Sequence, residues 1–454
     1  MIFADALPQI KTFLKPACLA ASTLDLLVRL IAAFCHHPGR MSADAAAKAV
    51  RSQARHRAQI ARFLARCHWS KDWAVLDAVA GLLLEREARA AGPWAFLLDQ
   101  TYVGQQGTKT QNTYHCGNRT RRPRKGRRYQ TRKLAKRSGH AFVMGLLLTP
   151  SGFRIPCCRC YYTEAYCRER GLPYRKQTEL AAELIHAVAV PPAARVVVLG
   201  DTAFEAKAIR AACAARGFSW VVPLNPERVL AGSKPRPKVK SLVSGLSAAD
   251  FEAVRLIPGQ GSYVAQRRAA RCRVGPNSKA RTFYVHPERR AVHNVGDVLL
   301  VFSTKEQPQP GREVAVQKVL MTDDVTRSAA EVVALYDLRW QIELFFKECK
   351  GTLGLHRYRF REFAKVEGWV QACLVAFVYL EWYRAEQLRR RDLPEKERRW
   401  WQGQRSYGVS GAVWQRAEEH DLGKLLRWSG TKAGLKRLRR ALRLAQPPEM
   451  RRPA

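Results

Sequence analysis

The stretch Tyr336–Lys350, with the sequence YDLRWQIELFFKECK, constrains the fold of this chain most strongly. It lacks Gly and Pro, is rich in good helix formers and is followed by Gly351, so it predicts a helix. At about 100° per residue, one face gathers polar side chains within roughly 80° of one another: Tyr336, Arg339, Glu343, Lys347 and Lys350. The opposite face, with Leu338, Ile342, Phe345 and Cys349, is predicted to lie on a core. A lone carboxylate among cations is also typical of a solvated face with salt bridges.

The spacing of this polar face resembles a known signature. Tyr336-x2-Arg339-x3-Glu343-x6-Lys350 is similar to the Tyr–Arg–Glu–Lys motif of bacterial insertion-sequence transposases with an Asp–Asp–Glu catalytic triad, most of all the insertion-sequence-four type. The neighbouring residues support the resemblance: Phe345, Phe346, Lys347 and Leu353 to Leu355. It implies two further aspartates upstream, each at the end of a strand.

The charge balance points to a polyanionic partner. Lys and Arg number 79 and Asp and Glu 38, which gives a net charge of +41 and favours nucleic acid over a membrane surface. No apolar run approaches the roughly 20 residues that span a bilayer, and no signal peptide is recognisable. Twelve scattered Cys indicate reduced thiols in a cytosol. Without a Walker-type loop, we expect no nucleotide cofactor.

The first candidate aspartate follows an apolar run. Pro93–Thr101, PWAFLLDQT, predicts a buried strand with Asp99 near its C-terminal end, although a lone Asp there is more often a turn residue. Beyond it, Thr101 to Thr163 contains no acid, and Arg119–Arg137 contains eleven Lys or Arg. We expect this flank to bind DNA phosphates rather than bases, through Arg124, Lys125, Arg127 and Arg128.

A hairpin and a cysteine cluster follow. Ala141–Thr149 and Phe153–Tyr162 predict two strands that turn at Pro150-Ser151-Gly152. Cysteines 157, 158, 160 and 167, with His115, Cys116 and His140 nearby, suggest zinc, but their spacing is not a standard ligand pair. Small core filling is the favoured interpretation of cysteines that alternate along a strand.

The second candidate aspartate has the same setting as the first. A predicted helix, Gln177–Val190, precedes the buried strand Arg195–Asp201, RVVVLGD, which ends in Asp201. Thr202-Ala203-Phe204, a helix to Arg216 and a strand Phe218–Leu224 come next, an order that resembles the second catalytic motif of the same family. The predicted order of elements is that of an RNase H-like domain.

The flanking segments are predicted to be helical and basic. Residues 8–36 and 70–91 have apolar helical patterns, and between them a helix capped by Ser42 gathers cations opposite Ile60, Leu64 and Cys67. That basic stripe predicts DNA-binding residues, or alternatively an ordinary solvated face: Arg51, Arg55, Arg62 and Arg66. Phe363–Glu386 predicts an amphipathic helix, Arg389–Gly403 a linker, and Leu435–Ala445 a basic helix that binds DNA or a second protomer.

The segment 225–328 changes to short β runs. They are predicted at Tyr263–Ala269, Thr282–His286, Val298–Ser303 and Val316–Thr322. A β-rich insertion between the second Asp and the Glu is what the resemblance implies, and in that group an aromatic residue of the insertion can hold a flipped base. This insertion has no Trp; Tyr263, Phe283 and Tyr284 could substitute but fit core packing better.

Together these observations predict an α/β fold: an RNase H-like catalytic domain with a β-rich insertion, flanked by helical N- and C-terminal parts. The expected divisions are a DNA-binding domain at 1–91, a catalytic domain at 92–224 and 329–388, an insertion at 225–328 and a basic helical region at 389–454.

The expected activity is cut-and-paste DNA transposition. Asp99, Asp201 and Glu343 would bind two Mg²⁺ ions, with Mn²⁺ able to substitute, because hard cations prefer carboxylate oxygens. Tyr336, Arg339, Lys347 and Lys350 would hold phosphates near the scissile bond. The resemblance further implies double-stranded DNA with terminal inverted repeats, a target DNA, a homodimer on paired ends and a nucleoid-associated place in a bacterial cytoplasm. The alternatives are a metal-dependent nuclease without strand transfer and a non-catalytic DNA-binding derivative.

Overall fold

The computed structural model describes residues 6–36, 42, 45–46, 57–65, 68–105, 109–116, 137–232, 235–256 and 281–436. The chain forms two compact units. One, the helical unit, comprises residues 1–83, 104–111 and 346–454. The other, the sheet unit, comprises residues 84–103 and 112–345.

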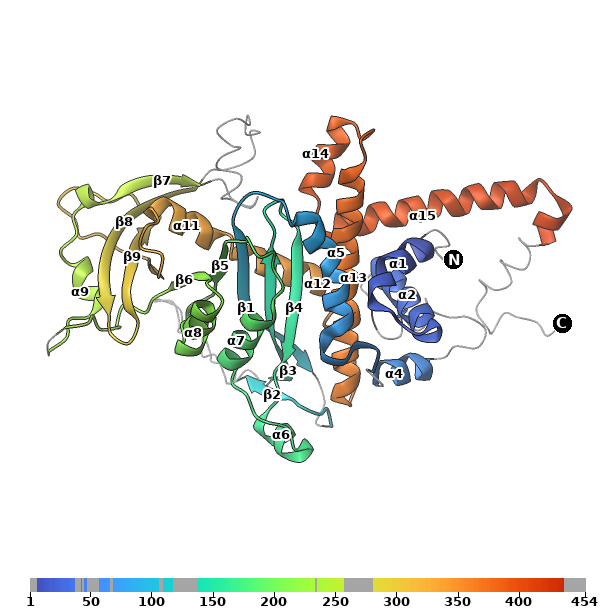
Figure 1. The fold of residues 1–454 in the computed structure, drawn as a ribbon, viewed down its shortest axis with the longest axis horizontal. Helices are drawn as coiled ribbons and strands as arrows, with labels where there is room; N and C mark the ends of the chain where they lie inside the picture. The colour runs from blue at the N-terminus through green and yellow to red at the C-terminus, as the bar shows by residue number, and fades with distance from the viewer. Residues whose placement is uncertain are drawn as a thin grey trace, which may run out of the picture. The chain divides into compact units, whose positions relative to one another are not determined.

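Within the described residues, one mixed sheet of ten strands organises the sheet unit (Figure 1). The strand order is β2-β3-β1-β5-β6-β10-β9-β8-β7, and β4 pairs with β3. The strands of its first half are β1 (Trp94–Gln105), β2 (Tyr114–Cys116), β3 (Arg137–Leu148), β4 (Arg154–Cys160), β5 (Val196–Leu199) and β6 (Ser219–Pro223). Here β1, β5 and β6 run parallel and β3 and β4 antiparallel, an arrangement consistent with an RNase H-like core.

The apolar runs of the sequence explain this half of the sheet. All four residues of β5 are buried, as expected for a parallel strand covered on both faces. The predicted hairpin is confirmed: β3 and β4 pair from Phe142 with Cys160 to Leu148 with Arg154. At the turn, Gly152 has a φ of 83° and its amide donates to the Thr149 carbonyl at 2.9 Å.

Two helices cover one face of these strands (Figure 1). They are α7 (Gln177–Ala187), which contacts β3 and β4, and α8 (Lys207–Ala215), which contacts β6 and α7. Arg216 joins them, because its guanidinium donates to the carbonyl oxygens of Ile185 at 3.3 Å and Val188 at 3.0 Å. A short helix that the sequence did not predict, α6 (Glu164–Arg170), lies between β4 and α7 and is capped by Thr163.

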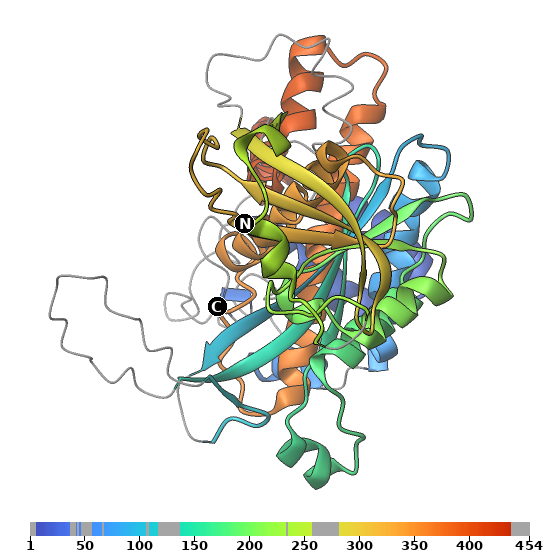
Figure 2. The same ribbon diagram turned by 90° about the vertical axis from the view of Figure 1, so that its left-hand side faces the viewer.

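The segment 225–328 extends the same sheet, because β10 pairs with β6 as well as with β9. Its strands are antiparallel, and β8 and β9 are long and curved (Figure 2). Its elements are α9 (Val239–Val243), η4 (Ala248–Asp250), β7 (Glu252–Leu256), β8 (Arg281–Val292), β9 (Gly296–Thr304) and β10 (Lys318–Thr322). The predicted runs at Thr282, Val298 and Val316 are thus found as β8, β9 and β10, whereas Tyr263–Ala269 lies outside the described residues.

The helical unit is built around α13 (Phe363–Arg389). Helices α1, α2, α4, α14 and α15 contact it. Twenty of the 27 residues of α13 are buried, including every residue from Gly368 to Glu381, so the helix is buried on all sides there and is not amphipathic as predicted. By length and composition it is the one described helix that could cross a membrane, but 83% of its apolar window is buried in the protein, which is the pattern of a core helix.

The other helices of the chain show where the predicted boundaries were wrong. The pattern over 8–36 is divided into α1 (Ala6–Leu14), η1 (Lys15–Ala17) and α2 (Ala21–His36), because Pro16 interrupts the helix. The predicted linker after Arg389 contains α14 (Glu395–Gly403). The remaining elements are α4 (Arg57–Ala65), η2 (His68–Trp73), α5 (Ala74–Glu87), η3 (Thr202–Phe204), α11 (Ala329–Asp337), α12 (Trp340–Gly351) and α15 (Ser406–Ser429).

Candidate active site

Two neighbouring parallel strands bring Asp99 and Asp201 together. In the β1–β5 register, Leu97 pairs with Leu199, so each aspartate follows its paired leucine by two residues. Asp201 lies just beyond the end of β5, and its carboxylate accepts a hydrogen bond from the Ala203 amide at 2.9 Å. Asp99 is not near the end of its strand as predicted, because β1 continues to Gln105. Strand β1 itself continues past Asp99, but its pairing with β5 ends at Leu97, two residues before Asp99.

The predicted helix over Tyr336–Lys350 is in fact two helices. Helix α11 ends at Asp337 and α12 begins at Trp340. At the junction the amides of Leu338 and Arg339 bond to carbonyls three residues back, at 3.0 Å each, which is the tighter 3₁₀ pattern. The apolar face is confirmed, since it is buried on both sides of the junction: Leu338, Ile342, Phe345 and Cys349.

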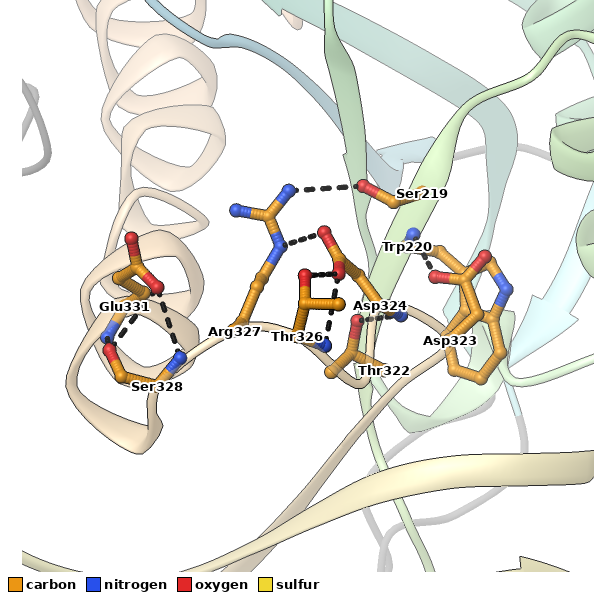
Figure 3. Close-up of polar contacts among 9 residues, drawn as sticks. All are labelled: Ser219, Trp220, Thr322, Asp323, Asp324, Thr326, Arg327, Ser328 and Glu331. Atoms are coloured by element: carbon orange, nitrogen blue, oxygen red, sulfur yellow. Dashed lines mark hydrogen bonds and ion pairs between the residues drawn. The ribbon is translucent and has the colours of Figure 1, made fainter. Parts of the chain in front are cut away.

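The loop that leads into α11 is held by a polar network between β6 and β10 (Figure 3). Asp323 accepts a hydrogen bond from the Trp220 amide at 2.9 Å. Asp324 accepts from the Thr326 hydroxyl at 2.6 Å and forms an ion pair with Arg327 at 3.0 Å. Ser328 and Glu331 then form a capping box at the start of α11. This network anchors the first turn of α11 to the sheet.

Arg339 lies between two of the three acids. Its guanidinium is 3.4 Å from the Asp99 carboxylate and also donates to Glu343, one turn along the helix. The side chains of Arg339 and Asp99 are only 18% and 17% exposed, so this ion pair is shielded from solvent. The structure therefore joins residues 240 positions apart in the sequence.

The surroundings of Asp99 raise the pKa of its carboxyl group. Burial, with repulsion from Asp201 and Glu343, raises the pKa of Asp99 from its usual 3.8 to about 6. The Gln100 amide, at 2.7 Å from the carboxylate, and the Arg339 guanidinium act in the opposite direction. Three carboxylates thus share one site in which negative charge is not fully compensated, and such a site favours additional cations.

Tyr336 forms an aromatic edge of the site. The Arg339 guanidinium carbon is 6.0 Å from its ring centre, and the Lys318 ammonium is 4.6 Å from it. Burial raises the pKa of the Tyr336 hydroxyl. Lys318 comes from β10 of the 225–328 segment, and sequence reasoning missed it, because nothing in a single strand shows which helix it will face.

The structure describes only some of the predicted DNA-binding residues. On α12, Lys347 is exposed, and the Lys350 ammonium lies 5.9 Å from the Phe346 ring centre. On α4, Arg62 is exposed while Ile60 and Leu64 are buried, as the predicted two-faced helix requires. The other predicted contacts lie outside the described residues: Arg51, Arg55, Arg66, Arg124, Lys125, Arg127 and Arg128.

The cysteine cluster fills the core, as favoured from the sequence. Cys158, Cys160 and Cys167 are buried. Cys157 lies opposite Gly145, where an added methyl group would meet its sulfur at 2.6 Å. In the part of the chain that the structure describes, no three His, Cys, Asp or Glu residues are grouped so that they could hold a metal ion.

The site belongs to a known class. The model of the DDE superfamily endonuclease family matches residues 16–248, more than half of the chain and a range that includes Asp99 and Asp201. The chain therefore belongs to the DDE superfamily. The model of the transposase DDE domain matches residues 175–379, which include Asp201, Tyr336, Arg339, Glu343 and Lys350. Enzymes of this family cut DNA in transposition. No curated protein matches the chain.

Proteins of this family generally use divalent metal ions, and three acids here have the chemistry to bind them, although the described residues do not group any three such side chains into a metal site. Asp99, Asp201 and Glu343 offer the carboxylate oxygens that Mg²⁺ prefers. Burial first, and then repulsion from Asp201 and Glu343, raises the pKa of Asp99, and a bound cation would favour its ionised form. In the arrangement described here, Arg339 supplies the positive charge between Asp99 and Glu343. Those two carboxylates would have to exchange this partner when they bind a metal ion.

Proposed function

We propose that this protein is a cut-and-paste DNA transposase whose catalytic residues are Asp99, Asp201 and Glu343. The observation that carries the proposal is the contact of Arg339 with both Asp99 of β1 and Glu343 of α12, with Asp201 just beyond the end of the neighbouring strand β5. Their interactions support it: Arg339 contacts Asp99 and Glu343, and both Asp201 and Glu343 contribute to the raised pKa of Asp99. No single one of these acids would identify an active site.

The three acids would hold two Mg²⁺ ions, or Mn²⁺ in their place. Bound there, such ions supply a nucleophile near neutral pH and stabilise the leaving oxygen of a phosphodiester. The side chains around the acids have a positioning role. Tyr336 and Arg339 would orient the phosphates that flank the scissile bond, and Lys347 and Lys350 would bind the DNA further along α12.

The finer assignments rest on the resemblance of the Tyr–Arg–Glu–Lys motif to that of insertion-sequence transposases. The protein would be encoded by a mobile element of the insertion-sequence-four type in a bacterial host. It would act as a homodimer that joins paired transposon ends at the nucleoid. The protein would cut at terminal inverted repeats and then join the new 3′ ends to target DNA. The basic residues of α4 and of the acid-free flank would contribute most of the salt-dependent affinity for DNA.

The experiment that tests this proposal supplies a substrate and a target together. Purified protein and Mg²⁺ are added to a supercoiled plasmid that carries the DNA flanking the gene, with a second plasmid as target. Excision of the flanked segment followed by its joining to the target is the expected result. Cutting without joined products would assign the protein to metal-dependent nucleases, and binding without cutting would assign it to non-catalytic DNA-binding proteins.

Each acid can be tested separately in the same assay. Asp99→Asn, Asp201→Asn and Glu343→Gln are each expected to abolish cleavage and leave DNA binding nearly intact, because they remove a charge and keep the shape. Asp297→Asn is the matched control, since Asp297 is an exposed acid of β9. A variant of the three that still cuts at the wild-type rate would remove its residue from the catalytic set.

A further inference from the structure

A pair of lysines lies beside the acids on strands that the catalytic motif does not include. Lys318 is the first residue of β10 and pairs with Ser303 of β9, and Lys305 follows the end of β9 directly. The Lys305 amide donates to the Gln317 side chain at 3.3 Å, and the Gln317 amide donates to the Ser303 carbonyl at 3.0 Å. These bonds fix the two lysines next to each other at one end of the β9–β10 ladder.

Each ammonium group lies against an aromatic ring. The Lys318 nitrogen is 4.6 Å from the ring centre of Tyr336, and the Lys305 nitrogen is 5.9 Å from that of Phe283 on β8. Contacts of this kind hold a cation in place without neutralising it. Among the residues that the structure describes, neither lysine forms an ion pair within 4.0 Å, although both are exposed.

Cations and acids both lie around the pair of lysines. Lys318 is exposed as a whole residue, but partial burial of its ammonium group, with repulsion from Arg339 and Lys305, lowers the pKa of Lys318. The acids that face these lysines are Glu343, which is already paired with Arg339, and Asp337, which also faces Arg281. Lys305, Lys318 and Arg339 therefore repel one another, and an anion bound among them would relieve this repulsion.

We propose that Lys305 and Lys318 form a binding site for phosphodiester groups of the DNA that enters the active site. The class of ligand follows from the donors, because an ammonium group binds phosphate as a point charge and needs no particular base. The two lysines are binding residues: they contact the backbone and hold the DNA against Tyr336 and Arg339. The inference rests on the proposed function, since it assumes that DNA is the substrate.

The salt dependence of DNA binding tests the pair. The probe is a linear duplex carrying the gene's flanking sequence, in EDTA so that nothing is cut, with full-length protein and its Lys318→Ala and Lys305→Ala/Lys318→Ala variants. Log affinity decreases linearly with log salt concentration, and the steepness of this decrease is expected to be smaller by about 0.9 for each lysine removed, or about 1.8 for the double variant. Lys318→Arg is expected to restore the wild-type slope.

Lys240→Ala is the matched control. Lys240 is an exposed lysine of the same segment, and its partner Glu227 keeps a second lysine, Lys238, at 2.7 Å. Its slope is expected to equal that of the wild type. If the double variant binds DNA with an unchanged slope, the lysine site is wrong while the proposed function stands. If the wild-type protein binds no duplex at all, the proposed function fails and the lysine site fails with it.

Discussion

Replacing Asp99 by Asn is expected to stabilise the metal-free protein at neutral pH. The carboxylate is 17% exposed and lies near two other acids, and this environment raises its pKa from 3.8 to about 6. A tenfold change in proton affinity corresponds to about 1.4 kcal/mol, so the ionised form costs the folded state about 3 kcal/mol. Asn has the same shape and can still accept hydrogen bonds from Gln100 and Arg339, but it carries no charge.

The sign of this effect gives it a pH signature. Below pH 3.8 the Asp99 carboxyl is protonated in both the folded and the unfolded state, so the folded state carries no cost of ionising it and its stability is highest with respect to this group. As pH rises to about 6, the unfolded state releases the proton and the folded state retains it, and the stability that the raised pKa provides is lost through this window. The advantage of Asp99→Asn over the wild type should therefore grow between pH 4 and pH 6.5 and then remain constant.

The assay is urea unfolding in EDTA, followed by tryptophan fluorescence, at pH 4.5 and pH 7.5. Trp94 of β1 and Trp220 of β6 are buried in the sheet unit and report on its unfolding. Asp297→Asn is the control and is expected to show no pH-dependent difference from the wild type. The reasoning would be refuted if Asp99→Asn differed from the wild type by the same amount at both pH values, or were less stable at pH 7.5.

Three further predictions follow from the packing around the site and in the helical unit. Arg339→Met should destabilise the protein in EDTA by about 1–3 kcal/mol, because Asp99 and Glu343 lose their shared cation. Mn²⁺ should then recover more stability than it does in the wild type, and a melt unaffected by Mn²⁺ would contradict this. Glu381→Ala should destabilise the helical unit by about 3–5 kcal/mol, because it leaves the charge of Arg384 buried without its partner. Both residues of this ion pair are under 5% exposed. Urea unfolding measures the effect, and an unchanged midpoint would be inconsistent with that burial. Lys350→Ala should weaken binding to transposon-end DNA in a gel-shift assay while its melting temperature stays near that of the wild type; equal binding by both proteins would refute it.

Much of the sheet and the helical setting of Glu343 could be predicted from the sequence because their signals are local. Buried strands such as β5 are short apolar runs in the sequence. The β3–β4 hairpin is predicted by the Pro-Ser-Gly sequence at its turn. The Tyr–Arg–Glu–Lys spacing is equally local, and it located Glu343 on a helix with a buried opposite face.

Features that depend on distant contacts could not be predicted. The β1 strand continues past Asp99, and α12 begins only after a 3₁₀ turn at Arg339, because the preferences of single residues do not decide either boundary. The Arg339–Asp99 contact joins positions 240 residues apart, and the approach of Lys318 to Tyr336 depends on the pairing of β10 with the sheet. Charge alone identified neither contact.

The central claim is that Glu343 belongs to a metal-dependent site that cuts DNA. The most direct test measures Mg²⁺-dependent cleavage and, in parallel, binding of the flanking DNA by wild type, Glu343→Gln and Glu313→Gln. Glu313 is an exposed acid of the same unit and serves as the control. We predict that all three proteins bind and that only Glu343→Gln fails to cut. Cleavage by Glu343→Gln at the wild-type rate would contradict the active site described here.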